Sequence, residues 1–133
     1  MKTFLLIGLD PNTLADAAAA TLRATIADMQ QQFAARGDRL DLCVIKLDGL
    51  AEAPVTAQLA RATYGCAFIG GGLREPDAHL ELLERIVNAI HHQAPGTAIG
   101  FVLEPDGCLK AADRVLSHTY KLAGLLASSA LVA

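Results

Sequence analysis

Short apolar runs alternate with longer segments of helical periodicity along most of the chain. Each run is four to seven residues long and is bounded by glycine, proline or charged residues. Continuous apolar runs of this length are typical of strands that are covered on both faces of a sheet. We therefore predict four strands, at residues 4–9, 41–47, 66–69 and 98–103.

The segments between these runs repeat apolar side chains every three or four residues, as amphipathic helices do. We predict helices at about 15–36, 54–63, 77–94 and 111–126, with Gly37 ending the first and Pro95-Gly96 ending the third. Thr13 and Asp16 loosely resemble a capping box at the start of the first helix. Two stripes are expected to be buried: Leu22, Ile26, Met29 and Phe33, and then Leu80, Leu83, Ile86, Val87 and Ile90. On the last helix, Val115, Leu116 and Leu122 are expected to face inward.

Strands that alternate with helices predict parallel pairing and right-handed crossovers. The predicted fold is a single α/β domain over residues 1–133, a three-layer α/β/α sandwich of Rossmann-like or flavodoxin-like type with a four-stranded parallel sheet. We expect the strand order 2-1-3-4, with 3-2-1-4 as the second choice. The first and third strands are the most apolar and should be central, whereas Lys46 indicates that the second lies at or near an edge.

The third predicted strand ends in three consecutive glycines, Gly70, Gly71 and Gly72, and a helix follows shortly afterwards. Glycine tolerates a positive φ and permits close approach to the backbone. The free N–H groups at a helix N-terminus favour anions, and Arg74 adds a guanidinium suited to carboxylate or phosphate. The alternative is that the glycines only permit a tight turn, because neither a phosphate-binding loop with lysine nor a dinucleotide fingerprint is present.

Ligands of open parallel sheets bind beyond the carboxyl ends of the strands, where the strand order reverses. For the order 2-1-3-4, this point lies between the first and third strands, so residues 8–12 and 70–75 should face each other. Asp10 and Arg74 would meet there, and Asp48 and Glu104 would flank them. The predicted ligand-binding residues are Gly8, Asp10, Gly70, Gly71, Gly72, Arg74 and Glu104.

Other kinds of site are less well supported by the sequence. Asp10, Asp48, Glu104 and Asp106 would hold Mg²⁺ if they converged, but acidic residues at strand ends are commonly turn formers and caps. His91 and His92 are adjacent and point about 100° apart on a helix, so we predict no metal site. The chain has no Gly-x-Ser-x-Gly motif for serine hydrolysis, and no residue pattern specifies a cofactor.

The composition of the chain limits the kinds of partner that we expect it to bind. The net charge is −3 with no basic stripe, which argues against nucleic acid. Three cysteines without a Cys-x-x-Cys pair, and no signal peptide at the start, lead us to expect a cytoplasmic protein. Cys43 and Cys66 should be buried, and Cys108 should be inert although it falls in a predicted loop. The apolar tail, 122–133, is shorter than the ~20 residues that span a bilayer. We therefore expect no membrane partner and a tail that packs on the body or on a second subunit, as in a homodimer.

Several segments resemble a family of small single-domain α/β proteins of bacteria and fungi. They are residues 7–11 (Ile-Gly-Leu-Asp-Pro), 41–45, 64–66 and 69–74, of which Ile-Gly-Gly-Gly-x-Arg is the most specific. The similarity covers most of the chain up to Pro105. The resemblance implies the α/β fold and gives no information about an activity. Relatives end the fourth strand in Asn-Thr-x-Pro, whereas this chain has Val102-Leu103-Glu104-Pro105, so any ligand contact by that amide and hydroxyl is lost here.

Three hypotheses of function follow. The first, which we favour, is a binding module for an anionic or carboxylate-bearing small molecule at residues 70–74. The second is a small enzyme, a hydrolase or isomerase, that uses Asp10 or Glu104 as acid–base and Arg74 as an electrostatic clamp. The third is a non-catalytic oligomer assembled through the apolar tail.

Overall fold

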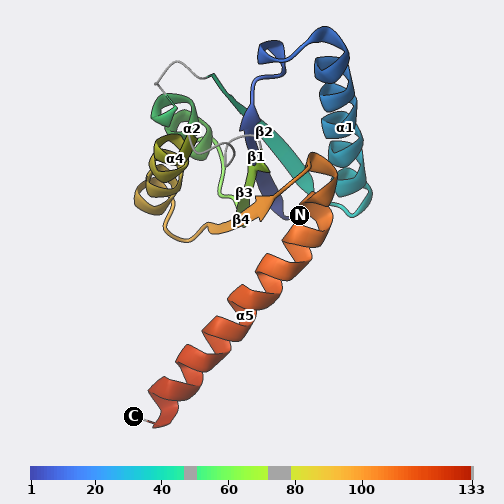
Figure 1. Cartoon of the computed structure of the whole chain (residues 1–133). Coiled ribbons are helices and arrows are strands. Elements are labelled where there is room, and N and C mark those ends of the chain that lie inside the picture. The colour runs from blue at the N-terminus through green and yellow to red at the C-terminus, as the bar shows by residue number, and fades with distance from the viewer. Residues whose placement is uncertain (47–50, 72–78, 133) are drawn as a thin grey trace.

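The computed structural model describes residues 1–46, 51–71 and 79–132 of the 133-residue chain. A four-stranded parallel sheet lies between two helical layers (Figure 1). The strands are β1 (Thr3–Leu9), β2 (Arg39–Ile45), β3 (Cys66–Gly70) and β4 (Ala98–Val102). The helices are α1 (Asp16–Ala35), α2 (Glu52–Leu59), α4 (Leu80–Gln93) and α5 (Cys108–Val132), with the 3-10 helices η1 (Pro11–Thr13) and η3 (Pro105–Gly107).

The strand order is β2-β1-β3-β4, which confirms the order 2-1-3-4 and rules out the second choice. β1 and β3 occupy the centre, and Leu6 of β1 is paired with Leu42 of β2 and Phe68 of β3. Both central strands bury most of their side chains, as their continuous apolar sequences predicted. Because all four strands run in one direction, their carboxyl ends meet at the same edge of the sheet.

The alternation of side chains along each strand divides the core into two halves. Phe4 and Leu6 of β1 face the layer of α1 and α5, whereas Leu5 and Ile7 face the layer of α2 and α4. The first half includes Ile26, Met29, Phe33, Leu40, Cys66, Phe68, Val102 and Cys108. The second includes Cys43, Ile45, Val55, Leu59, Tyr64, Ile69, Ile86 and Ile90. Burial of one large apolar side chain stabilises the fold by about 1.5–3 kcal/mol.

Some predicted boundaries and two predicted core residues, Leu80 and Leu122, were wrong. α2 covers Glu52–Leu59 and not 54–63, and β2 begins at Arg39 because that residue pairs with Thr3 of β1. Leu80 was expected in the buried stripe of α4, but it is the first residue of the helix and is 58% exposed. The rest of the stripe faces the sheet, with Ile86 and Ile90 fully buried.

The last helix is longer than the sequence predicted. α5 begins at Cys108, directly after η3, and continues to Val132. Its first half packs on the sheet beside the N-terminus, whereas its second half runs away from the body (Figure 1). Leu122 and Leu125 on this second half are 59% and 67% exposed, so the expectation that Leu122 faces inward was wrong, because this part of α5 has left the sheet. Among the described residues, no helix combines the length and apolarity that crossing a membrane would require.

Candidate functional site

A cavity of about 210 Å³ lies at the carboxyl edge of the sheet, on the side covered by α1. Four of the seven predicted ligand-binding residues line it: Gly8, Gly70, Gly71 and Glu104. They come from the ends of β1, β3 and β4, which the strand order places next to one another. Gly72 and Arg74, also predicted to bind the ligand, lie outside the described residues, as does Asp48.

Gly71, directly after β3, is required for the close approach of two backbone segments. A Cβ atom on Gly71 would lie 2.6 Å from the carbonyl oxygen of Leu103, whereas one on Gly70 would lie 3.4 Å from that of Ile7, an ordinary contact distance. The prediction that glycine supplies a positive φ here does not hold for Gly70 and Gly71, because Gly37 is the one described glycine with positive φ. Gly71 therefore lets the ends of β3 and β4 converge on the cavity.

Asp10 has a structural role in the turn after β1. Its carboxylate accepts a hydrogen bond from the Asn12 N–H at 3.0 Å and so caps η1, and its own N–H donates to Ile45 O. Asp10 is buried, and it is not among the residues that line the cavity. The Thr13 hydroxyl donates to Asp10 O at 2.7 Å, and Ala15 begins α1 without a side-chain cap, so the expected capping box does not form.

We expect Asp10→Ala to lower the free energy of unfolding by about 1 kcal/mol, because the Asn12 N–H loses its acceptor. Asp10→Asn keeps an oxygen at the same place and should lose much less. Denaturant unfolding of the two variants beside the parent chain measures both effects. Equal losses for the alanine and asparagine variants would contradict the capping role.

The cavity walls are mostly aliphatic. Leu22 and Ile26 of α1 form one side, and Leu6, Leu9, Leu14, Leu42, Val102 and Leu103 complete the lining with Pro105. Glu104, which is exposed, is the one charged residue among the described lining residues. An open groove of about 530 Å³ shares Leu14, Leu22, Glu104 and Pro105 with the cavity and continues along α1. Glu104 therefore stands where the cavity opens into this groove.

Sequence reasoning missed these aliphatic lining residues as part of the site. Leu22 and Ile26 belong to the stripe that predicted the buried face of α1, and nothing in a helical repeat distinguishes a core side chain from a cavity wall. The available signal was the alanine content of the first turns of α1. Ala17 and Ala18 line the open groove next to the cavity, and their small side chains leave it less filled than leucines would.

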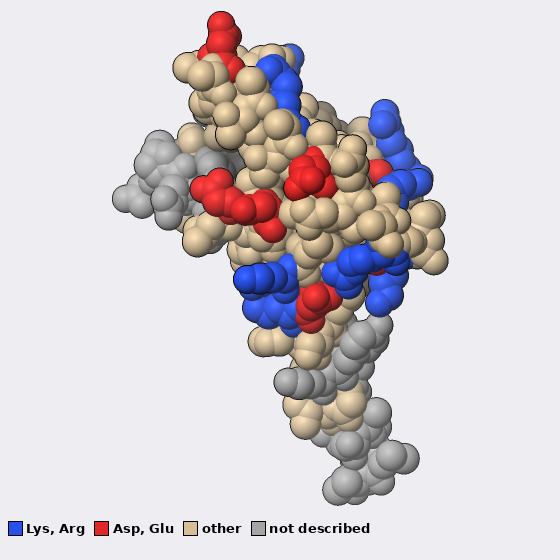
Figure 2. Space-filling view, turned by 90° about the vertical axis from the view of Figure 1, so that its right-hand side faces the viewer, with Lys and Arg blue, Asp and Glu red and all other residues tan. Residues whose placement is uncertain are grey.

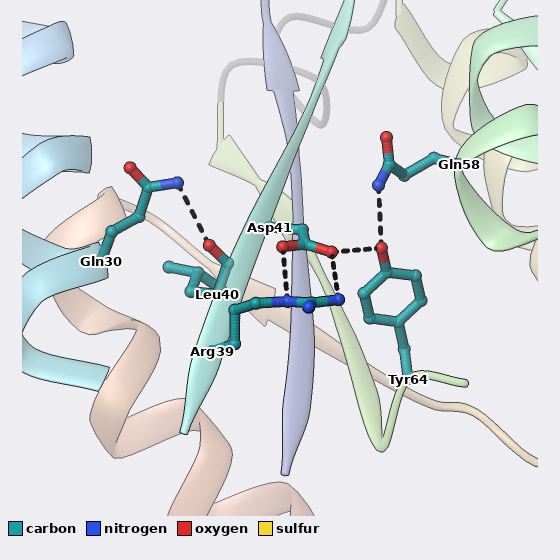
Figure 3. Close-up of polar contacts among 6 residues, drawn as sticks. All are labelled: Gln30, Arg39, Leu40, Asp41, Gln58 and Tyr64. Carbon is teal, nitrogen blue, oxygen red and sulfur yellow. Dashed lines mark hydrogen bonds and ion pairs between the residues drawn. The ribbon is translucent and has the colours of Figure 1, made fainter. Parts of the chain in front are cut away.

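Sequence reasoning also missed a polar network (Figure 3). It joins β2 and α2 to Tyr64, which precedes β3 in the chain. The Tyr64 hydroxyl donates to the Asp41 carboxylate at 2.6 Å and accepts from the Gln58 amide at 2.8 Å. Arg39 pairs with the same carboxylate, with its Nε 3.0 Å from Asp41 Oδ1. Burial and the bond to Asp41 raise the pKa of the Tyr64 phenol. Because Tyr64 is 1% exposed, we assign this network to stability rather than to ligand binding.

The three thiols are buried, as expected, including Cys108 at the first residue of α5. Burial raises the pKa of Cys43 to about 11 and the pKa of Cys66 and Cys108 to about 12, from an ordinary value of 9.0. The thiolate is the nucleophilic form, and each unit of pKa lowers its population about tenfold. These cysteines are therefore poor nucleophiles at neutral pH.

We expect a thiol reagent at pH 8 to modify the native protein at least roughly a hundredfold more slowly than it modifies the unfolded chain, because both the access and the ionisation of the thiols are restricted. Counting modified thiols by mass spectrometry, with and without denaturant, provides the measurement and its control. Modification of even one native thiol at the rate of a free cysteine would contradict this expectation.

The fold and the cavity together define the class of this protein: a small parallel α/β domain with an aliphatic cavity at the carboxyl edge of its sheet. Across residues 1–46, 51–71 and 79–132, no three His, Cys, Asp or Glu side chains group in a way that could hold a metal ion. Comparisons with family models and with curated proteins give no match for this chain.

Proposed function

We propose that this protein is a binding module for a small molecule with an aliphatic body and one polar head group. The observation that carries the proposal is the cavity, in which three strand ends and α1 surround about 210 Å³ of mostly aliphatic space. An apolar cavity of about 150 Å³ in another protein is sufficient to bind benzene. The volume therefore suits a molecule of roughly six to ten non-hydrogen atoms.

Two charged residues bear on the charge of the head group: Glu104, which lies at the cavity mouth, and Arg74, which lies outside the described residues. Our prediction from the sequence is an anionic group, such as a carboxylate, held by Arg74 and the N–H groups after β3. Glu104 opposes that prediction, because its own charge at the mouth favours a cation or a hydrogen-bond donor. A matched ligand series separates the two, since one aliphatic chain can carry a carboxylate, a hydroxyl or an amine.

The test is a thermal-shift titration with hexanoate, hexanol and hexylamine. A ligand at a hundred times its Kd stabilises the folded state by about 2.7 kcal/mol, so binding raises the Tm. We expect hexanoate to give the largest shift and Arg74→Ala to reduce its response to that of hexanol. A preference for hexylamine that Glu104→Gln removes would keep the cavity as the binding site and would overturn the anionic head group.

Gly8 offers a variant that fills the cavity. Its side-chain direction follows Phe4 and Leu6 toward α1, and a Cβ at this position meets no atom within 4 Å. We expect Gly8→Leu to fold and to abolish the thermal shift, because leucine would occupy the ligand's volume. The control is Val44→Leu, an enlargement on β2 at a residue that does not line the cavity. Equal shifts in the two variants, or no shift in the parent with any ligand, would refute the proposal.

The enzyme hypothesis is the second candidate, and the geometry favours it less. Asp10 is already engaged in capping η1, so an acid–base role would fall to Glu104 with Arg74. The binding proposal uses Glu104 and Arg74 too, so a loss of binding in a variant of either residue does not separate the two hypotheses. Turnover of a carboxylate ester or amide that Glu104→Gln abolishes, with binding retained, would favour the enzyme.

A further inference from the structure

The second half of α5 projects away from the body (Figure 1), and its sequence is apolar. Leu122 and Leu125 are exposed there, and residues 122–133 contain no charged side chain. At a rise of about 1.5 Å per residue, residues 122–132 extend roughly 16 Å. That is about half of the roughly 30 Å hydrocarbon core of a bilayer. The segment is therefore long enough to enter a lipid surface and too short to cross it.

Basic side chains gather where α5 leaves the body. This is the amino edge of the sheet, where the strands begin and where α1 and α2 end. The residues placed there are Lys2, Arg36, Arg39 and Arg61, which we call the basic collar, together with Asp38, Asp41 and Asp113, the ion-pair partner of Arg36. The rest of the sequence has seven basic and eleven acidic residues, so a chain with net charge −3 is positive at this end.

The charge separation is visible on the face formed by α1 and α5. In Figure 2, blue side chains lie around the base of the projecting helix with acidic groups among them, whereas red side chains dominate the middle of the body above. Ion pairs occupy some collar residues. Arg36 pairs with Asp113 and Arg39 pairs with Asp41, each at 3.0 Å. The collar keeps an excess of basic residues after both pairs are formed.

We propose that α5 and the basic collar dock this protein on an anionic lipid surface, a membrane contact that the sequence did not lead us to expect. An apolar helix segment beside a basic cluster provides the two contributions that hold proteins at such surfaces, burial among the acyl chains and attraction to anionic headgroups. The charge of the collar also argues against a second copy of the chain as the partner that covers α5. Two copies joined side by side through α5 would bring two positive collars together, whereas anionic lipid neutralises each one.

Docking in this orientation leaves the ligand cavity exposed to water. The cavity lies at the carboxyl edge of the sheet, and the collar lies at the amino edge. The docking is therefore independent of the proposed function, and either can fail without the other.

Vesicle flotation with the full chain tests the proposal. We expect flotation with phosphatidylcholine vesicles that contain phosphatidylglycerol, little or none with phosphatidylcholine alone, and weaker binding as salt is raised. Each basic residue near such a surface contributes roughly fivefold in affinity, so Lys2→Gln with Arg61→Gln should weaken binding roughly 30-fold. Lys46→Gln, a basic residue after β2 at the opposite edge, is the matched control and should bind like the parent.

The contribution of the apolar part of α5 to lipid binding is tested by a separate pair of variants. Leu122→Glu with Leu125→Glu should abolish flotation, whereas Leu80→Glu, an equally exposed leucine on α4, should leave it unchanged. Circular dichroism of every variant confirms folding. Absence of flotation with anionic vesicles at low salt, or equal flotation with neutral vesicles, would overturn the proposal. So would a doubled mass by sedimentation that Leu122→Glu with Leu125→Glu returns to that of one chain, because a second copy would then cover α5.

Discussion

Gly71→Ala should destabilise the fold by about 1–3 kcal/mol, which corresponds to a Tm lower by roughly 4–12 °C. The added methyl group would lie 2.6 Å from the carbonyl oxygen of Leu103, closer than real Cβ atoms approach. That oxygen belongs to the backbone directly after β4, so relief requires the end of β4 to move away from β3. Denaturant unfolding monitored by circular dichroism measures the loss.

Two other glycines provide controls for this prediction. A Cβ at Gly8 meets no atom within 4 Å, so Gly8→Ala should leave stability nearly unchanged. At Gly100, the nearest atoms belong to the side chains of Phe68 and Val115, at 3.0 and 3.1 Å. Side chains can shift by a few tenths of an ångström, so Gly100→Ala should cost less than Gly71→Ala. An order in which Gly71→Ala is the mildest of the three would contradict the close approach of β3 and β4.

Tyr64→Phe should lower the free energy of unfolding by about 2 kcal/mol. The substitution removes a hydroxyl that donates to the Asp41 carboxylate and accepts from Gln58, and a hydrogen bond to a charged group is worth about 1.5–3 kcal/mol. Gln58→Ala, which removes only the outer partner, should cost less. Because the two residues share one hydrogen-bond chain, their double variant should lose less than the sum of the single losses.

The cost of Tyr64→Phe should also depend on pH. Burial and the bond to Asp41 raise the pKa of this phenol in the folded state above its ordinary value of 10.0. A raised folded-state pKa contributes stability that is fully present below pH 10 and is lost as the pH rises through the folded pKa. The difference in stability between the parent chain and the Tyr64→Phe variant should therefore shrink above pH 10. Unfolding curves between pH 8 and 11 test this, and a constant difference would contradict a neutral, hydrogen-bonded Tyr64. The buried thiols lower stability from about pH 9 in both chains alike.

Much of the fold was predictable because strand and helix formation depend on local pattern. The apolar runs located all four strands to within two residues at each end. The uninterrupted apolar character of β1 and β3 placed them in the centre, and Lys46 placed β2 at an edge. The errors fell where a local pattern is ambiguous. Leu80 matches the helical stripe of α4, yet it stands at the first residue of the helix, where more than half of its surface stays exposed.

The candidate site was predictable in part, for a related reason. Parallel alternation places the ends of β1, β3 and β4 at one edge, so Gly8, Gly70, Gly71 and Glu104 were expected together and do line one cavity. The aliphatic character of the cavity was not predictable, because Leu22 and Ile26 of α1 have the same spacing whether they fill a core or border a space. The role of Asp10 was also missed, since a carboxylate after a strand suits a ligand and a turn equally well.

The sequence by itself determined the element types, their order and the edge of the sheet at which polar and glycine residues collect. These properties follow from backbone periodicity and from the single direction of parallel strands. Only the tertiary structure decided that Gly71 lies against Leu103 and that Tyr64 bonds Asp41, residues far apart in the chain. Such contacts depend on strand register and on how closely two elements approach, which arise from the packing of the whole core rather than from any one segment.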